Sequence, residues 1–447
     1  YIYIHLFLLD MALPFTIESS YICQFDTTQG NTLLNYTSKG TETISFEDLE
    51  YMSLPSGLHD LPTESDTVKF QILDSNGKKY LSMCRVYNNS KSVIAMESST
   101  ASMNIGIDRT KVKIYSLGII VSLLKDDDIE NLVLYEESII KQIDSCYKDF
   151  SSQTESKQYI TTTTDKLLDL LSNDSQLTES NTWREPYQLL KSMDCLIFPL
   201  WKQLMLQKKI LIINNDNTKI SFDELNKLVE YLKNISANIN YNSVYNTALS
   251  NYESVLNNSK KCYIAYTTDA ILKDATQSYD VLLELNKNNN IRLSDSHGTP
   301  LHATFVESLR LITQFKDDYS KFDGKSKSQQ FIDFFYLLFT FNSIKPGYYK
   351  YIDTAVDIPL QAPLERQRFD KWIISLNSGI EQLLKSDSSY NKNTKVLVLK
   401  PSDVLTLGFD GFNKNDLEFM KNYIKQGEFS TTISNIDFKN FDFSLFI

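Results

Sequence analysis

The stretch that decides the fold is residues 187–213, YQLLKSMDCLIFPLWKQLMLQKKILII. Its apolar residues recur three and four positions apart, a spacing that places them on one face of a helix. They are Leu189, Leu190, Met193, Ile197, Leu200, Trp201 and Leu204. Pro199 interrupts this run, so we expect a kink or two helices that meet there, because proline removes a backbone donor and crowds the preceding turn. Residues 210–213, ILII, follow without alternation, which is typical of a strand covered by helices on both faces. The stretch therefore predicts an α/β core.

The first half of the chain shows several strands followed by a helix. The segments predicted as strands are 20–27, 31–36, 66–73, 79–87 and 113–124. Asn76 and Gly77 separate the third from the fourth, and this pair is typical of a type I′ hairpin turn. Three aspartates at 126–128 predict the start of a helix that reaches Tyr147, because acidic residues favour the positive end of a helix. We therefore expect an α/β/α sandwich ahead of residue 150.

The rest of the chain continues the alternation of strands and helices. Residues 151–164 are rich in Ser, Thr and Gln and predict a linker, and residues 166–171 predict the start of another helix. Ser221 and Glu224 form a capping-box pattern ahead of a helix that has apolar residues on one face. Apolar runs at 305–315 and 331–341 predict helices. Later elements are predicted as a helix over 365–385, with Trp372 on its apolar face, and a strand over 395–399.

Three stretches resemble one protein family. Residues 198–213 resemble the central helix and strand of a DENN domain. Residues 263–272, YIAYTTDAIL, with 279–283 behind them, resemble a signature of the LCHN-type DENN proteins, in which cysteine commonly stands where this chain has Tyr266. Residues 404–425 resemble the carboxy-terminal module of the same type through Leu407, Gly408, Phe409 and Asp410. The resemblance implies a tripartite DENN protein, with a longin-like module followed by a DENN lobe.

The fold expected from these patterns is α/β, with a longin-like α/β/α module, a DENN α/β lobe and a largely helical carboxy-terminal part. A chain of 447 residues exceeds the roughly 250 to 300 residues of a single core, so two or three domains are expected. We place the longin-like module at 15–150, the linker at 151–180, the central DENN lobe at 181–345 and the carboxy-terminal module at 346–447.

Composition and charge exclude several classes of function. The formal net charge of −11 argues against non-specific nucleic-acid binding, which depends on positive charge that neutralises phosphates. Contact with an anionic membrane would require a local basic patch. The five cysteines are far apart and form no CxxC pair, so a disulfide framework or a zinc site is not expected and a reducing cytoplasmic setting fits.

The apolar amino-terminal segment, residues 1–9, is shorter than the ~20 residues that a spanning helix needs. We interpret it as translated upstream sequence with Met11 as a start. The alternative interpretation is a membrane anchor.

No reactive constellation is evident in the sequence. His297 and His302 lack the carboxylates or thiolates that would complete a metal site, so we expect neither a metal nor a cofactor. The surface residues singled out are Lys208, Thr267, Thr268 and Asp269. The Thr-Thr-Asp group fits turn stabilisation through its short oxygens or contact with a partner. Lys208 fits a solvated residue before a strand or a contact with a GTPase or lipid.

The resemblance implies a guanine nucleotide exchange factor for a Rab-type small GTPase in membrane trafficking, cytoplasmic or peripheral on endomembranes. Such a factor binds the nucleotide-free GTPase best and by reciprocity weakens nucleotide binding. One alternative is a non-catalytic adaptor that binds a GTPase or a second longin-DENN chain. A second alternative is a GTPase-activating protein, which requires an exposed arginine such as Arg310, Arg366 or Arg368.

Overall fold

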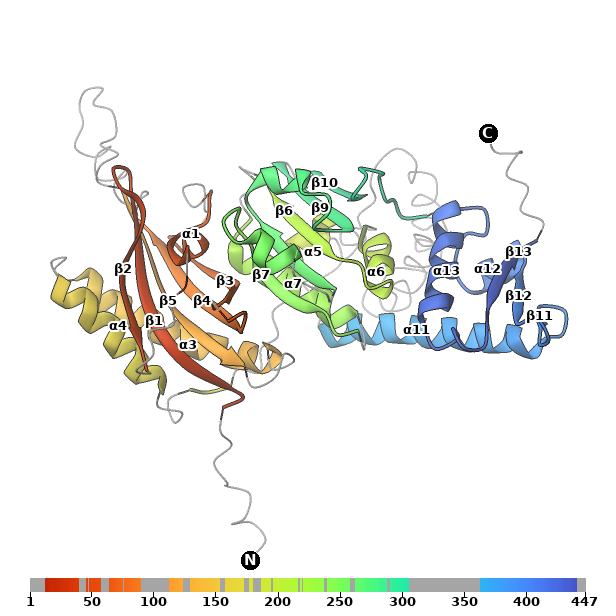
Figure 1. Ribbon diagram of the computed structural model, residues 1–447, viewed down its shortest axis with the longest axis horizontal. Coiled ribbons are helices and arrows are strands. Elements are labelled where there is room, and N and C mark those ends of the chain that lie inside the picture. The colour runs from red at the N-terminus through yellow and green to blue at the C-terminus, as the bar shows by residue number, and fades with distance from the viewer. Residues whose placement is uncertain are drawn as a thin grey trace, which may run out of the picture.

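The computed structural model describes residues 13–39, 46, 48–57, 64–74, 76–89, 112–123, 129–152, 157–172, 177–179, 186–193, 196–215, 218, 220–236, 239–257, 262–287, 290–304 and 362–439. Within them a large mixed sheet runs through the first two thirds of the chain, and a smaller module follows at the other end of an elongated molecule (Figure 1). The predicted helices at 305–315 and 331–341 lie outside the described residues. The architecture is α/β with a more helical carboxy-terminal part, as the sequence predicts.

The amino-terminal module contains an antiparallel sheet in the order β3-β4-β5-β1-β2. Its strands are β1 (Phe15–Asp26), β2 (Gly30–Ser38), β3 (Ser65–Leu73), β4 (Lys79–Asn88) and β5 (Lys113–Leu123). The predicted strands are therefore present, and β1 starts five residues earlier than expected. Strand β5 lies between β4 and β1, and most of its residues are buried.

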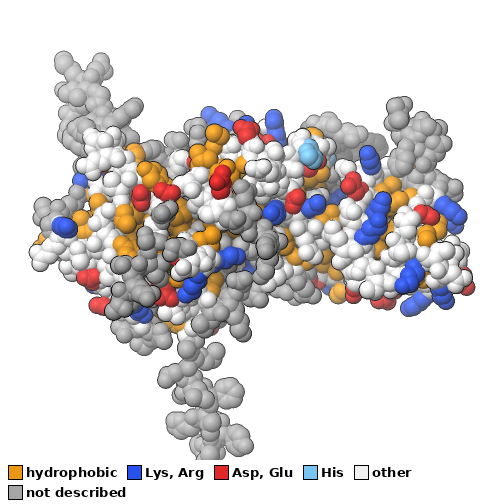
Figure 2. Space-filling model, viewed as in Figure 1, with side chains coloured by type: hydrophobic (Ala, Val, Ile, Leu, Met, Phe, Trp, Pro, Cys, Tyr) orange, Lys and Arg blue, Asp and Glu red, His pale blue; other side chains and the backbone are white. Residues whose placement is uncertain are grey.

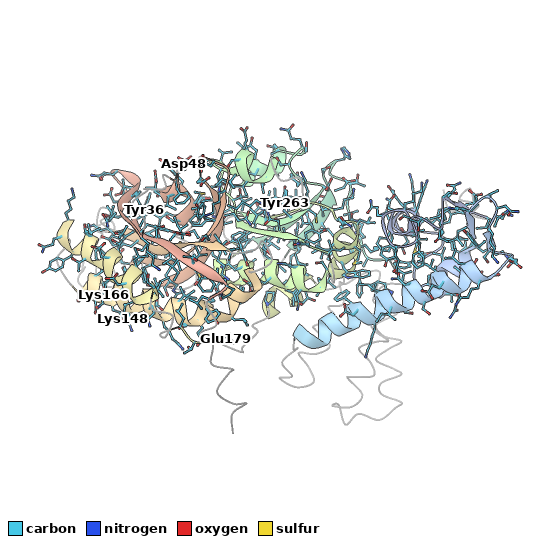
Figure 3. The ribbon with its side chains drawn as sticks, turned by 60° about the horizontal axis from the view of Figure 1, so that its bottom comes forward. Tyr36, Asp48, Lys148, Lys166, Glu179 and Tyr263 are labelled. Carbon is cyan, nitrogen blue, oxygen red and sulfur yellow. The ribbon has the colours of Figure 1, made fainter. Side chains whose placement is uncertain are left out.

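Helices lie on both faces of this antiparallel sheet. They are α1 (Leu49–Ser53), α3 (Ile129–Ser151) and α4 (Lys157–Ser172). Successive residues of a strand point to opposite faces. On β4, Cys84 contacts the carbonyl of Ser53 in α1, whereas Arg85 and Tyr87 bond to Asp144 in α3. Figure 3 shows α3 and α4 side by side, with Lys148 and Lys166 labelled on them.

The turn between β3 and β4 differs from the predicted two-residue type I′ turn. The strands end at Leu73 and resume at Lys79, so the loop has more residues than that turn type allows. Gly77 has a φ of 78°, and the Asp74 carboxylate accepts hydrogen bonds from the backbone N–H groups of Asn76 and Lys78. The aspartate thus stabilises a wider loop, which the Asn-Gly pattern alone does not reveal.

The segment predicted as a linker contains a helix. Helix α4 lies inside 151–180, and its Leu167, Leu168 and Leu171 are buried. The Thr164 hydroxyl bonds to Asn35 and Thr37 of β2, at 2.6 and 2.9 Å. The helix predicted to begin at Lys166 therefore starts at Lys157. The polar composition obscured its first half, because its sheet-facing side is built from threonine hydroxyls as well as leucines.

The central module continues the same sheet with parallel strands. These are β6 (Ile210–Asn214), β7 (Asn242–Asn246), β8 (Tyr263–Thr267) and β9 (Val281–Asn286), with β10 (Asn290–Asp295) antiparallel at the edge. Their order is β10-β9-β6-β8-β7, and β7 pairs with β3 through the single residue pair Phe70 and Asn246. The sheets of the two modules are therefore joined into one ten-stranded sheet in the described residues.

The decisive stretch forms two helices and a buried strand, as predicted. Helix α5 (Tyr187–Met193) ends before α6 (Ile197–Met205) begins, and Pro199 lies in the first turn of α6, where a missing N–H costs little. Strand β6 is buried along its whole length between β8 and β9. Helix α7 (Phe222–Ile235) is capped as predicted, because the Ser221 hydroxyl accepts a bond from the Glu224 N–H at 3.1 Å.

The carboxy-terminal module packs against α6. Helix α11 (Ala362–Lys385) runs from beneath the central module to this module (Figure 1). The remaining elements are β11 (Tyr390–Asn391), β12 (Val396–Leu399), α12 (Pro401–Thr406), α13 (Lys414–Gln426) and β13 (Asn435–Phe438). Trp201 stacks on Trp372 with ring centroids 4.4 Å apart, so both tryptophans belong to the core, as predicted. Beside them, a buried Lys202–Asp416 ion pair of 2.6 Å joins α6 to α13.

Candidate functional site

The candidate site lies where the parallel strands end beside the amino-terminal module. Strands β7 and β8 run parallel, so the loops after Asn246 and Thr267 leave the sheet at one edge. In α/β sheets, binding sites form at the carboxyl ends of the strands. Here α1 and the loop after it approach the same edge. Asn246 Nδ2 donates to the Met52 carbonyl at 3.4 Å, which ties β7 to α1.

The Thr267–Thr268–Asp269 group joins three segments. The Thr267 hydroxyl oxygen accepts a bond from the Asp269 N–H at 3.0 Å, so Thr267 stabilises the turn. One Asp269 carboxylate oxygen accepts from the Ser56 hydroxyl at 3.0 Å, and the other accepts from the Leu249 N–H at 2.8 Å. Thr268 and Ser56 hydroxyls lie 3.0 Å apart. Asp269 therefore ties the loop after α1 to both loops of the central module.

A cleft of about 520 Å³ opens at this junction. It is lined by both modules: Phe25, Asn31, Asp48, Tyr51, Leu54, Pro55, Ser56, Gly57 and Ile114 from one, and Ala248, Leu249, Ser250 and Asp269 from the other. Figure 2 shows hydrophobic side chains gathered over α1 and the neighbouring loops. Asp48, labelled in Figure 3, adopts a left-handed φ of 60° where the chain enters α1.

Two large apolar side chains that line the cleft are exposed, and so is a third in the turn that follows Asp269. Tyr51 of α1 is 49% exposed and Leu249 is 52% exposed. Ile271, in the 3₁₀ turn η7 (Ala270–Asp274) directly after Asp269, is 60% exposed. We call Tyr51, Leu249 and Ile271 the apolar rim. The side chains of Ser56, Thr268 and Asp269 are already bonded to one another. The apolar rim therefore offers apolar contact area and no reactive side chain.

Lys208 lies at the amino ends of the parallel strands, opposite the ends that carry the cleft. It precedes β6, and β6 pairs with β8 in register from Ile210 with Ile264 to Ile213 with Thr267. Asp269 follows the end of β8, so it is separated from Lys208 by about 20 Å along the strands. The Lys208 carbonyl accepts a bond from the Tyr241 hydroxyl at 3.0 Å. The structure thus brings Thr267, Thr268 and Asp269 together and leaves Lys208 apart.

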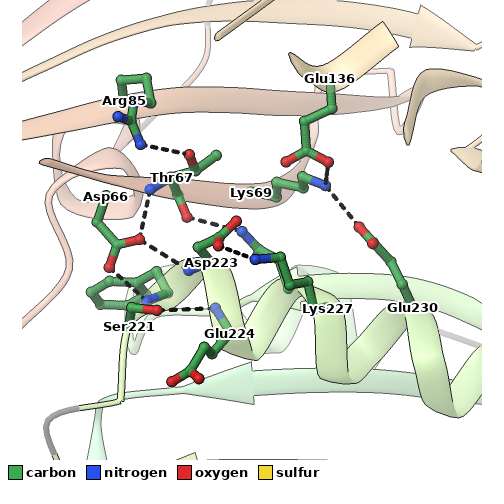
Figure 4. A network of polar contacts seen from close by, with 12 residues as sticks. Asp66, Thr67, Lys69, Arg85, Glu136, Ser221, Asp223, Glu224, Lys227 and Glu230 are labelled. Atoms are coloured by element: carbon green, nitrogen blue, oxygen red, sulfur yellow. Dashed lines mark hydrogen bonds and ion pairs between the residues drawn. The ribbon is translucent and has the colours of Figure 1, made fainter. Parts of the chain in front are cut away.

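A buried ion network joins the two modules between β3, α3 and α7 (Figure 4). Lys69 Nζ in β3 lies 2.6 Å from Glu136 in α3 and 2.7 Å from Glu230 in α7. Burial alone acts to lower the pKa of Lys69, but the two carboxylates raise it well above its usual value, whereas burial raises the pKa of Glu230. The two short contacts support a charged lysine between both glutamates.

Asp66 of β3 caps a helix of the other module. Its carboxylate accepts bonds from the N–H groups of Phe222 and Asp223, at 2.7 and 3.0 Å, at the start of α7 (Figure 4). Burial raises the pKa of Asp66 to about 6, although these bonds act to lower it. The helix start favours the ionised form. The contact between β3 and the start of α7 therefore depends on the protonation state of Asp66.

The residues matched by a known family cover this whole arrangement. The model of the family "DENN domain-containing protein 11" matches residues 20–294, which is more than half of the chain. The chain belongs to this family. The DENN match therefore includes the cleft, the apolar rim and the Lys69 network. "Uncharacterized protein ANR2" of Saccharomyces cerevisiae is 22% identical over 491 residues, and the alignment covers 94% of this chain and 93% of the yeast protein.

Among the other candidates from the sequence, His297 and His302 line a second cleft of about 1000 Å³ together with Asp295 and Lys273. His297 and His302 lie in an exposed turn after β10, and no group of three or more His, Cys, Asp or Glu that could hold a metal occurs among the described residues. Arg366 and Arg368 lie on α11, but their side chains are not among those that the structure describes. Arg310 lies outside the described residues. None of the helices in the described ranges combines the length and apolarity needed to cross a bilayer.

Sequence reasoning missed the apolar rim and the Ser56 contact. Tyr51 and Ser56 are almost 200 residues from Leu249 in the chain, so no local pattern links them. One signal was present, because Leu54 and Pro55 put apolar residues into the loop after α1, where polar residues are usual.

Proposed function

We propose that this DENN chain is a guanine nucleotide exchange factor for a Rab-type small GTPase in membrane trafficking, of the LCHN subtype. The observation that carries the proposal is a cleft with an exposed apolar rim, built from two modules that a buried ion network holds in one geometry. A GTPase bound across the junction would have its switch segments held by surfaces of both modules. The division at 15–150, 151–180, 181–345 and 346–447 is part of this proposal.

The proposed mechanism is differential binding. A surface that binds the nucleotide-free GTPase more tightly than the loaded form weakens nucleotide binding by the same factor. Switch segments of GTPases are ordered by contacts with phosphate and Mg²⁺, so displacing them weakens nucleotide retention. Such a mechanism needs shape and apolar contact rather than an acid, a base or a metal. The Asp269 carboxylate, which is bonded to Ser56 and Leu249, and the exposed apolar rim fit that need.

The contact residues of the proposal are the apolar rim together with Thr268 and Asp269. Thr267 is buried, so its proposed part is to hold the turn that presents its neighbours. Lys208 enters the proposal as a second contact, which only a GTPase that spans both edges of the sheet would reach. Peripheral association with endomembranes in the cytoplasm is included, since Rab substrates are membrane-bound.

Release of labelled GDP from a panel of Rab proteins tests the function. We expect accelerated release from one Rab or a small group, without faster GTP hydrolysis. Leu249→Asp and Ile271→Asp, which place charge on the rim, should lower exchange at least tenfold. The matched control is Ile374→Asp on α11, where the side chain is 67% exposed and outside the family-matched region.

The rival function is a non-catalytic adaptor. It is favoured by the same feature, a rim with contact area and no free reactive group. Binding of a Rab that Leu249→Asp abolishes, with no acceleration of GDP release from any Rab, would establish the adaptor. Faster phosphate release would instead require a GTPase-activating protein and would contradict both.

A further inference from the structure

Asp48 presents a carboxylate that is not bonded within the described part of the chain. It lies directly before α1, where its backbone carbonyl accepts bonds from the N–H groups of Tyr51 and Met52 at 3.1 and 3.2 Å. Its side chain caps no N–H group of α1, and it forms no hydrogen bond or ion pair with the residues that the structure describes. The side chain is partly buried. The Asp48 carboxylate is therefore open to a donor supplied from outside the chain.

This carboxylate belongs to the cleft between the two modules. Asp48 lines the cleft of about 520 Å³ together with Asp269, and its described lining residues include no lysine, arginine or histidine. Lys113 precedes the lining residue Ile114 in β5, but alternation along the strand directs its side chain to the opposite face of the sheet. The cleft therefore carries negative charge that no cation among its described lining residues offsets.

The two aspartates of the cleft differ in their bonds. One carboxylate oxygen of Asp269 accepts from the Ser56 hydroxyl at 3.0 Å, and the other accepts from the Leu249 N–H at 2.8 Å. These bonds hold Asp269 to the loops on either side of the cleft. Asp48 has no such bonds, so of the two aspartates it is the one with acceptor capacity left for a ligand.

The other lining residues suit the stem of a long cationic side chain. Leu54, Pro55 and Ile114 supply apolar surface. Lysine and arginine place their methylene stems along such surface while the charged head reaches a polar group. Tyr51 lines the same cleft three residues after Asp48 and is 49% exposed, and the face of an aromatic ring attracts a cation. Carboxylate, ring and apolar wall together match a lysine or an arginine.

We propose that the cleft receives a lysine or arginine side chain of the partner GTPase, and that Asp48 selects this side chain. The inference rests on the proposed function, because it names the group that the GTPase presents to the cleft. Charge complementarity selects the occupant, since a cationic head group gives the Asp48 carboxylate a charge-assisted hydrogen bond. A GTPase with an acidic side chain at this position is repelled, which discriminates between related GTPases.

Asp48→Asn isolates the charge of this residue. Asparagine adopts the left-handed conformation as aspartate does, so the φ of 60° before α1 is kept, and the side chain keeps its size. Asp387→Asn is the matched control, because Asp387 is exposed in the carboxy-terminal module and does not line the cleft. Equal melting temperatures of the unaltered chain and both variants establish that the variants fold.

Binding of nucleotide-free Rab proteins to the full chain tests the inference without requiring exchange. In the Rab that binds the unaltered chain best, Asp48→Asn should weaken binding about tenfold or more, since a hydrogen bond to a charged group contributes on that scale. Asp387→Asn should bind as the unaltered chain does. High salt should weaken binding of the unaltered chain more than binding of Asp48→Asn, because salt screens the ion pair that the variant lacks.

Substitutions in the same Rab identify the group that enters the cleft. Each lysine and arginine on its switch-bearing surface is replaced by glutamine, one at a time. One replacement should weaken binding to the unaltered chain and have little further effect on binding to Asp48→Asn, which is the coupling that a double-mutant cycle shows for residues in contact.

The outcomes separate this inference from the proposed function. Binding that depends on Asp48, with no faster GDP release, would support the inference and refute exchange. Faster GDP release with binding that Asp48→Asn leaves unchanged would refute the inference and leave exchange standing. Absence of binding by every Rab of the panel would overturn both. A Rab in which no lysine or arginine couples to Asp48 would overturn the inference, because the cleft would then take another group.

Discussion

Replacing Lys69 with methionine removes the cation at the centre of the buried network. Lys69 Nζ lies 2.6 and 2.7 Å from the Glu136 and Glu230 carboxylates, and its side chain is 3% exposed. Methionine keeps most of the apolar volume. The two carboxylates would then remain close together with no positive partner.

The expected cost follows from burial. Removing one partner of a buried ion pair costs about 3 to 5 kcal/mol, because the remaining charge is left without compensation. Here Glu230 would bear most of this cost, since it lies deeper than Glu136 and burial already raises its pKa. We therefore expect the free energy of unfolding of Lys69→Met to fall by about 4 kcal/mol.

Urea unfolding of the full chain measures this change, and hydrogen exchange of β3, α3 and α7 locates it. Lys166→Met is the matched control, because the Lys166–Asp149 pair of 2.5 Å joins α3 and α4 at the surface (Figure 3). Its loss should cost less than about 1 kcal/mol.

An apolar version of the whole network separates charge from packing. Lys69→Met/Glu136→Leu/Glu230→Leu should recover most of the loss, since replacement of a complete buried network is often neutral. Equal stability of Lys69→Met and Lys166→Met would refute the reasoning.

Further substitutions test other parts of the structure. Because the folded pKa of Asp66 is raised from 3.8 to about 6, its contribution is full below pH 3.8 and is lost as pH rises through about 6. Urea unfolding across this range should show a decline of about 3 kcal/mol that Asp66→Asn removes; an identical pH dependence of both proteins would contradict this. Gly118→Ala should lower stability by about 1 to 3 kcal/mol in thermal melting, because a Cβ there would lie 2.5 Å from Cys84 Cβ and 2.6 Å from the Tyr21 hydroxyl; an unchanged melting temperature would refute the clash. Lys208→Glu should lower GDP release less than Leu249→Asp, and the reverse order would place the GTPase at the other edge of the sheet.

Local patterns predicted those elements whose formation depends on neighbours in the sequence. The spacing of Leu200, Trp201 and Leu204 predicts α6, and the unbroken apolar run that follows predicts β6. Both predictions hold because the position of a residue in the chain sets the face of the helix or strand on which its side chain lies. Ser221 predicts the start of α7 because a cap acts within one turn. The form of the turn at Asn76 and the first half of α4 were missed, since Asp74 and the β2 hydroxyls supply the decisive bonds from outside the pattern.

The candidate site was predicted only in part for the same reason. The Thr267–Asp269 turn carries a recognisable signature, and in the structure Asp269 lines the cleft while Thr267 stabilises the turn. The pairing of Lys208 with that turn was not decidable from sequence, because strand direction and register set the edge at which each residue lies.

The sequence by itself determined the α/β class and the capped and buried elements of the central module, because these follow from periodicity and short-range chemistry. Its motifs at 198–213 and 263–272 carried the family resemblance. Only the tertiary structure decided that β7 joins β3, that Lys69 lies between Glu136 and Glu230, and that Tyr51 and Leu249 border one cleft. Each of these contacts joins residues 67 or more positions apart, and their partner choice depends on how the whole sheet assembles.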